Sequence, residues 1–139
     1  MLLAIDSGAS TGWALFDPTT RQLTACGLKN VPTSWQVPIT RIVVERPHAG
    51  KTRARAKDIL TLAIRAGEVG GLLRYLSGVE PEYIEPGRWK GQLNKDISNR
   101  IVKAKLLPQE MILLEQVKPK SAQHNVLDAI GIGLFFVGR

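Results

Sequence analysis

LLAIDSG at residues 2–8, followed by TGWALF at residues 11–16, is the stretch that decides the fold. A short apolar run that ends at Asp6 is typical of a buried strand with a carboxylate at its end. Glycines then punctuate a turn, and a second apolar run predicts a second strand. Residues 22–28 predict a third strand, so the chain opens with an antiparallel meander.

The rest of the chain predicts two further strands and several helices. Residues 39–45 become continuously apolar, as expected of a central strand, and Tyr83 and Ile84 lie at the heart of a fifth strand. Helical spacing or a helix boundary signal marks three further segments, namely residues 56–76, residues 96–106, and a last helix that starts at Ser121 or Gln123. Residues 109–120 are ambiguous. This order predicts an α/β fold in a single domain, 1–139, whose five-stranded mixed sheet has three antiparallel strands, then two parallel ones, and is flanked by helices.

Composition narrows the class of partner and the compartment. The chain has 139 residues and a formal net charge of +7, which favours polyanions and nucleic acid first. Cys26 is the only cysteine, so an intrachain disulfide and a cysteine-based zinc site are excluded, and we expect a cytoplasmic protein. No signal peptide is evident, and the longest apolar run, residues 129–138, is about half the length of a membrane span, so no membrane partner is expected.

Three carboxylates lie next to apolar runs, where an unpaired charge is costly. Asp6 and Glu45 each follow an apolar strand, and Asp128 lies in the last helix among almost entirely apolar neighbours. Such groups are expected to converge where a divalent cation neutralises them, and oxygen ligands suit Mg²⁺ or Mn²⁺. Simpler explanations remain open for each one: a turn cap for Asp6, an ion pair with Arg41 or Arg46 for Glu45, and an ion pair with a lysine for Asp128.

The motifs, taken in order along the chain, resemble a known family. They are LAIDSG at 3–8, TGWA at 11–14, VVE at 43–45, PGRWK at 86–90 and HNVLDAIG at 124–131. Together they resemble the RuvC-type Holliday-junction resolvases of the ribonuclease-H-like superfamily, in a compact, phage-like form. The resemblance covers most of the chain.

This resemblance implies a function and a site. The family cleaves four-way DNA junctions as a homodimer with two Mg²⁺ ions per active site, and we expect Mn²⁺ to substitute. Hydrolysis would leave 5′-phosphate and 3′-hydroxyl ends. By resemblance the catalytic metal ligands would be Asp6, Glu45 and Asp128, with Asn125 in the fourth position, and Lys90 would steady the phosphate charge.

Two departures from the family pattern leave questions open. The family's fourth ligand is Asp or His, whereas Asn125 is neutral, and His124 lies on the same helix face as Asp128. Either residue can complete the site. The family also has a long helix between the third and fourth strands, which residues 30–38, with two prolines, cannot form. One sheet face is therefore less covered, or is covered by Trp35.

Basic residues and glycines indicate binding surfaces. Two basic runs follow strand ends and are expected to contact DNA phosphates. The predicted DNA-binding residues are Arg46, Lys51, Arg53, Arg55, Lys57, Arg88, Lys90, Lys95 and Arg100. Three glycines interrupt the helix at 56–76, which makes it the candidate dimer interface, and they are Gly67, Gly70 and Gly71. Trp89 either packs or stacks on a base, and packing is favoured.

Other functions share part of this pattern. A nuclease of the same fold that acts on RNA or an RNA–DNA hybrid, such as a YqgF-like enzyme, has similar acids but another substrate. A non-catalytic junction-binding protein stays possible because Asn125 is neutral. An ATP-binding domain of the actin and sugar-kinase type also opens with a D-x-G strand, but it needs two domains, and this chain is too short.

Overall fold

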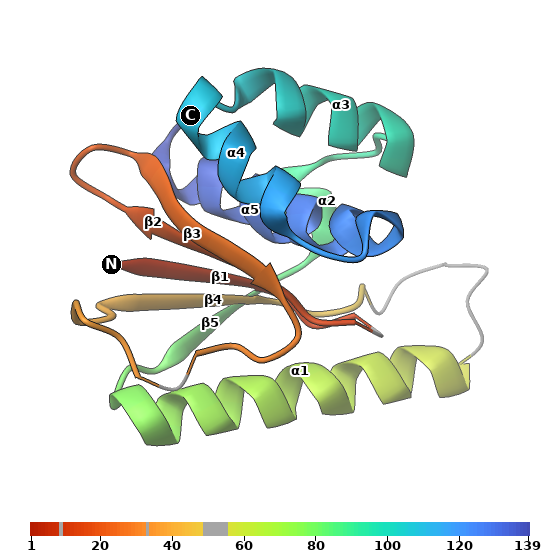
Figure 1. Cartoon of the computed structure of the whole chain (residues 1–139). Helices are drawn as coiled ribbons and strands as arrows, with labels where there is room; N and C mark the ends of the chain where they lie inside the picture. The colour runs from red at the N-terminus through yellow and green to blue at the C-terminus, as the bar shows by residue number, and fades with distance from the viewer. Residues whose placement is uncertain (9, 33, 49–55) are drawn as a thin grey trace.

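We describe the protein from a computed structural model that defines residues 1–8, 10–32, 34–48 and 56–139. A five-stranded sheet lies at its centre in the order β3-β2-β1-β4-β5 (Figure 1). Its strands are β1 (Leu2–Asp6), β2 (Gly12–Asp17), β3 (Gln22–Leu28), β4 (Arg41–Glu45) and β5 (Pro81–Ile84). β1, β2 and β3 pair antiparallel, whereas β4 pairs in parallel with β1 and with β5. The predicted α/β fold and mixed sheet are confirmed.

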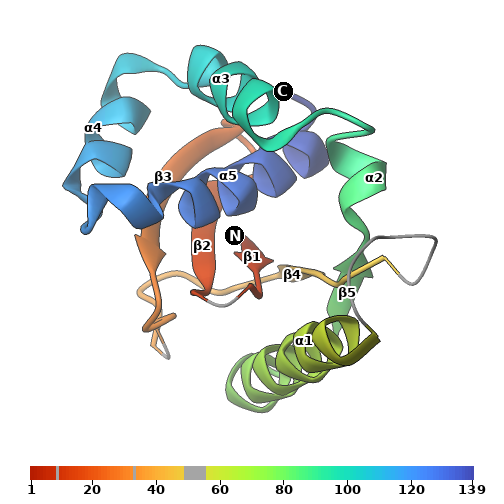
Figure 2. The ribbon, with the colours of Figure 1, turned by 90° about the vertical axis from the view of Figure 1, so that its right-hand side faces the viewer.

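Helices cover both faces of the sheet. The helices are α1 (Ala56–Ser77), α2 (Pro86–Trp89), α3 (Lys95–Lys105), α4 (Pro108–Gln116) and α5 (Gln123–Val137), with a 3-10 turn at Lys120–Ala122. α1 lies under one face, and α2 to α5 lie over the other (Figures 1 and 2). No helix among the described residues is long and apolar enough to span a membrane.

β1 is buried along its whole length because it faces both layers. Alternate side chains of a strand point to opposite faces. Leu2 and Ala4 join the core under α5, whereas Leu3 and Ile5 join the core above α1. The continuous apolar run that predicted a buried strand thus reflects a sheet covered on both sides.

α5 packs directly on the sheet because small residues allow a close approach. A Cβ at Gly133 would overlap the ring of Phe16, and a Cβ at Gly12 would overlap the backbone of Asn125. The start of β2 therefore touches the first turn of α5. This contact fixes the height of α5 over the sheet and brings Asp128 towards the end of β1.

The structure corrects several predicted boundaries. β4 begins at Arg41 and not at residue 39, although Ile39 is buried. α2 begins at Pro86, directly after the predicted fifth strand, and α4 occupies most of the stretch that was ambiguous from the sequence. Each of these two helices has a proline in its first turn, where its fixed φ suits a helix and its missing N–H has no cost.

Side-chain contacts stabilise the fold at the two outer layers of the sheet. Trp35 joins the core on the α1 side and packs edge-on against Trp13, with ring centroids 5.8 Å apart. The face left without the family's additional helix is thus covered by both α1 and Trp35.

On the other side, the fully buried Glu110 of α4 accepts hydrogen bonds from Arg139, at 2.6 and 2.9 Å, and from the backbone N–H of Leu23, at 2.7 Å. Burial opposes ionisation of Glu110, but these donors outweigh it and lower the pKa of the carboxyl.

Candidate active site

The parallel pairing of β1 and β4 places two carboxylates side by side. Asp6 and Glu45 are register partners at the carboxyl ends of these strands. Asp128 reaches the same place from α5, which crosses above, and all three line one open pocket. The opening turns of α1 form part of the wall through Ile59 and Leu62. Residues far apart in the sequence therefore meet at one edge of the sheet, as predicted.

Burial and neighbouring charges raise the pKa values of Asp6 and Glu45. Asp6 is 7% exposed, and burial first, then the charges of Glu45 and Asp128, raise its pKa from 3.8 to about 7. Burial also raises the pKa of Glu45, although Lys90 and a hydrogen bond from Trp89 oppose the rise. A site that keeps three acids together in a poorly solvated place favours a cation that can neutralise them.

Two lysines compensate part of this charge at Asp128. Nζ of Lys90 lies 3.8 Å from Oδ1, and Nζ of Lys95 lies 3.7 Å from Oδ2. These distances are too long for strong hydrogen bonds, and Oδ1 is a buried oxygen that accepts no hydrogen bond from any described residue. Asp128 is thus paired with lysines, as one of the simpler explanations supposed, yet it keeps an oxygen that needs a partner.

The simpler explanations for the other two acids meet different outcomes. Oδ1 of Asp6 accepts a hydrogen bond from the backbone N–H of Gly8 at 3.1 Å, so Asp6 also caps the turn. Glu45 pairs with neither predicted arginine, because Arg41 binds Glu82 and Arg46 binds Glu85.

Glu45 is instead held by an indole. Nε1 of Trp89 donates to Oε2 of Glu45 at 2.7 Å. From the sequence, Trp89 was expected to pack or to stack on a base, and no link with the carboxylates was predicted. One signal was present, because a buried indole N–H needs an acceptor and Trp89 follows the strand next to that of Glu45.

The two candidates for the fourth ligand both line the pocket. Asn125 and His124 lie in the first turn of α5, and each is partly buried. Nδ1 of His124 is 2.9 Å from the carbonyl oxygen of Ser121, so one ring nitrogen contacts the 3-10 turn that precedes α5. The choice between His124 and Asn125 as the fourth ligand stays a prediction.

The predicted DNA-binding residues spread around this pocket. Lys90, Lys95 and Arg46 line it, and Arg88 lies near Glu85 at the edge of the sheet beyond β5. Lys57 at the start of α1 and Arg100 on α3 are exposed. The remaining three lie outside the described residues, and they are Lys51, Arg53 and Arg55.

The donor set fits a hard divalent cation. Three carboxylates and an amide or imidazole are available, and one buried carboxylate oxygen lacks a hydrogen-bond partner. Mg²⁺ and Mn²⁺ prefer such oxygen ligands. No group of three His, Cys, Asp or Glu side chains in the described part of the chain is already arranged to enclose a metal ion. The chemistry therefore suits the cation, and side chains must adjust to bind it.

Comparisons with known proteins support the fold. No family model and no curated protein matches the sequence. Among solved structures, Thermus thermophilus RuvC in complex with a Holliday junction substrate is similar, with a TM-score of 0.55 and 18% identity over 96% of this chain and 90% of that one. Another structure of Thermus thermophilus RuvC gives a TM-score of 0.53, also at 18% identity, over 96% and 91% of the two chains. The ribonuclease-H-like fold predicted from the sequence is thereby confirmed.

Proposed function

We propose that this chain is a metal-dependent endonuclease that cleaves branched DNA, with four-way junctions as its substrate. The observation that carries the proposal is the convergence of Asp6, Glu45 and Asp128 in one pocket bordered by Lys90 and Lys95. The likeness to RuvC bound to a junction supports the choice of substrate. On this view residues 1–139 form a single nuclease domain.

The residues of the pocket have different proposed roles. Asp6, Glu45 and Asp128 would hold two Mg²⁺ ions, which Mn²⁺ could replace, and Asn125 would complete the set with His124 beside it. Bound there, the ions would supply Lewis-acid chemistry for phosphodiester hydrolysis, and the products would carry 5′-phosphate and 3′-hydroxyl ends. Lys90, which is mostly buried, holds the phosphate against the carboxylates. Because the cation replaces the proton on Asp6, binding strengthens as the pH rises towards 7.

Phosphate contacts surround the pocket on the proposed DNA path. Lys95 and Arg46 lie at its rim, and Lys57 extends the positive charge along α1. Arg88 and Arg100 extend it towards the other helical layer. Lys51, Arg53 and Arg55, which lie outside the described residues, are proposed to contact phosphates as well. Such contacts supply affinity for the backbone without reading the base sequence.

A homodimer would allow two symmetric cuts. The proposed interface is the outer face of α1, which exposes large apolar side chains, namely Leu60, Ile64, Leu72 and Tyr75. Gly67 and Gly71 have open space around them and permit a close approach. Gly70 does not serve this interface, because a Cβ there would overlap Tyr83 of the same chain. The interface thus rests on two of the three predicted glycines.

A non-catalytic junction-binding protein is the second candidate. The neutral Asn125 and the lack of a pre-arranged metal site among the described residues favour it. Retention of all three acids in a buried, mutually repulsive arrangement argues against it, since a binding protein gains nothing from that cost.

Cleavage assays on a panel of substrates test the proposal. A four-way junction, a linear duplex and an RNA–DNA hybrid are each incubated with Mg²⁺, Mn²⁺ or EDTA. We expect paired incisions in the junction with either metal and none with EDTA. Asp6→Asn, Glu45→Gln and Asp128→Asn should each stop cleavage and keep junction binding. Binding without cleavage in wild type would favour the second candidate, and cleavage of the hybrid alone would favour an RNA-processing nuclease.

A further inference from the structure

Trp89 contacts the carboxylate cluster in a way that its packing does not require. The side chain is partly buried at the end of α2, and its indole N–H points to Oε2 of Glu45 at 2.7 Å. A hydrogen bond to a carboxylate is short and strong in a poorly solvated place. The bond occupies one oxygen of Glu45 and leaves Oε1 for another partner.

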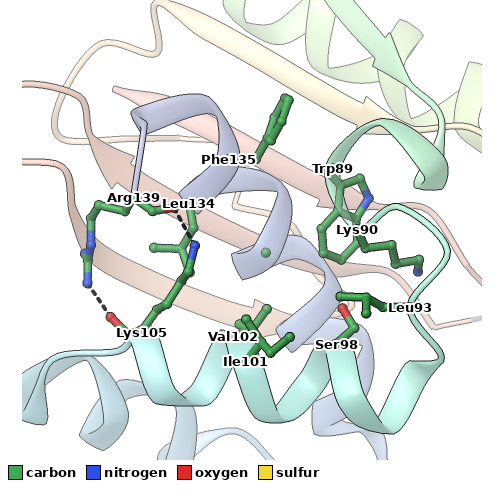
Figure 3. Close-up of a pocket in the computed structure, with 11 residues that line it drawn as sticks. Trp89, Lys90, Leu93, Ser98, Ile101, Val102, Lys105, Leu134, Phe135 and Arg139 are labelled. Atoms are coloured by element: carbon green, nitrogen blue, oxygen red, sulfur yellow. Dashed lines mark hydrogen bonds between the residues drawn. The ribbon is translucent and has the colours of Figure 1, made fainter.

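The indole is held from several directions. A Cβ at Gly131 of α5 would overlap the six-membered ring of Trp89, so the glycine provides the space in which the ring lies. Nζ of Lys90 lies 4.8 Å from the ring centroid, within the range of a cation–π contact. Figure 3 shows Trp89 and Lys90 together beside α5, at one end of a pocket between α3 and α5. The lysine next to the ring leaves little room for a base to stack there.

Backbone support for Glu45 comes from the residue that follows β1. The hydroxyl of Ser7, which is 4% exposed, donates to the carbonyl oxygen of Glu45 at 2.8 Å. Glu45 is thus fixed at its backbone by the residue after Asp6 and at its side chain by Trp89. A glutamate whose backbone and carboxylate are both fixed keeps one side-chain orientation. A glutamate without these contacts loses rotamer freedom when it binds a cation.

We infer that Trp89 is a positioning residue that fixes Glu45 so that Oε1 alone binds a divalent cation. This inference rests on the proposed function of the same site. Gly131 contributes to the same arrangement, because any side chain at this position would displace the indole of Trp89. Partners that hold a metal-binding carboxylate by hydrogen bonds typically contribute about 10- to 100-fold to metal affinity or activity.

The first test uses two matched tryptophans and a readout that is independent of cleavage. Trp89→Phe keeps a ring against Gly131 and removes the N–H. Trp13→Phe is the control, because Trp13 is also partly buried, packs on the α1 side of the sheet and donates through Nε1 to the carbonyl oxygen of Lys29 at 3.0 Å and not to a carboxylate. Mn²⁺ affinity is measured by electron paramagnetic resonance of the free ion. We expect Trp89→Phe to weaken binding about 10-fold and Trp13→Phe to leave it unchanged.

The second test has its main readout in the wild-type protein, and one variant is added as a check. Indole ¹H–¹⁵N resonances report the three tryptophans separately. Addition of Mg²⁺ should shift the signal of Trp89, because the carboxylate that accepts its hydrogen bond becomes a metal ligand through its other oxygen, and leave the signals of Trp13 and Trp35 in place. Glu45→Gln should shift the Trp89 signal without metal.

The outcomes separate the inference from the proposed function. If wild type binds no Mn²⁺, or if Glu45→Gln does not weaken binding, the proposed function fails. If wild type binds Mn²⁺ and Trp89→Phe binds equally well, with the Trp89 signal unmoved by Mg²⁺, the positioning role of Trp89 is refuted and the proposed function stands.

Discussion

Asp6→Asn should stabilise the metal-free protein at neutral and alkaline pH, although it should abolish cleavage. The substitution keeps the size of the side chain and the oxygen that accepts from Gly8. It removes a charge that is buried beside Glu45 and Asp128. A charged residue that lowers the stability of the fold is expected at a functional site.

The size and the sign of the effect follow from the pKa. Burial and the neighbouring carboxylates raise the pKa of Asp6 from 3.8 to about 7. Between these two values the folded protein holds a proton that the unfolded chain has lost, so the free energy of unfolding falls as the pH rises. A shift of this size corresponds to about 4 kcal/mol as an upper limit, and we expect Asp6→Asn to recover about 2 kcal/mol at pH 8.

Urea unfolding in EDTA at about pH 4 and about pH 8 measures this difference. The gain should be present at the higher pH and nearly absent at the lower one, where Asp6 is protonated in the folded state. Asp17→Asn is the matched control, because Asp17 accepts a hydrogen bond from the backbone N–H of Thr19 at 2.8 Å, which lowers its pKa. It should not stabilise the protein at either pH. An Asp6→Asn protein no more stable than wild type at pH 8 would refute the reasoning.

Three further predictions concern DNA, the metal and the core. Replacing Lys51, Arg53 and Arg55 with alanine should lower the slope of log K against log salt for junction binding by about 2 to 3, and an unchanged slope would show that these residues do not contact phosphates. Asn125→Asp should retain or raise Mg²⁺-dependent cleavage, and His124→Ala should cost less activity than Asn125→Ala; the reverse order in kinetic assays would make His124 the ligand. Arg139→Met should destabilise the fold by about 3 kcal/mol in urea unfolding, because it leaves Glu110 buried with its charge uncompensated; a loss below about 1 kcal/mol would contradict this.

The sheet was predictable because its strands carry simple local signals. Apolar runs that end in Asp6 and Glu45 marked β1 and β4, whereas the parallel register that pairs these two residues was visible only in the structure. The helices after β5 were harder. Pro86 and Pro108 each satisfy the rule for a helix start as well as the rule for a helix stop, and only the cap geometry decides between them.

The acids of the site were predictable, but their partners were not. A buried carboxylate at a strand end is costly in any fold, so its sequence position alone is informative. Contacts between Trp89 and Glu45, and between Lys95 and Asp128, depend on how α2, α3 and α5 pack on the sheet. Gly131 shows the same limit, because a glycine within a helix has no local purpose and gains one from the indole that lies against it.

Anomalous diffraction from crystals soaked in Mn²⁺ tests the central claim most directly. Our account predicts Mn²⁺ density bounded by the carboxylates of Asp6, Glu45 and Asp128, and its loss in Asp128→Asn crystals soaked in the same way. Mn²⁺ bound elsewhere, with these three carboxylates free of metal under conditions that support junction cleavage, would contradict it.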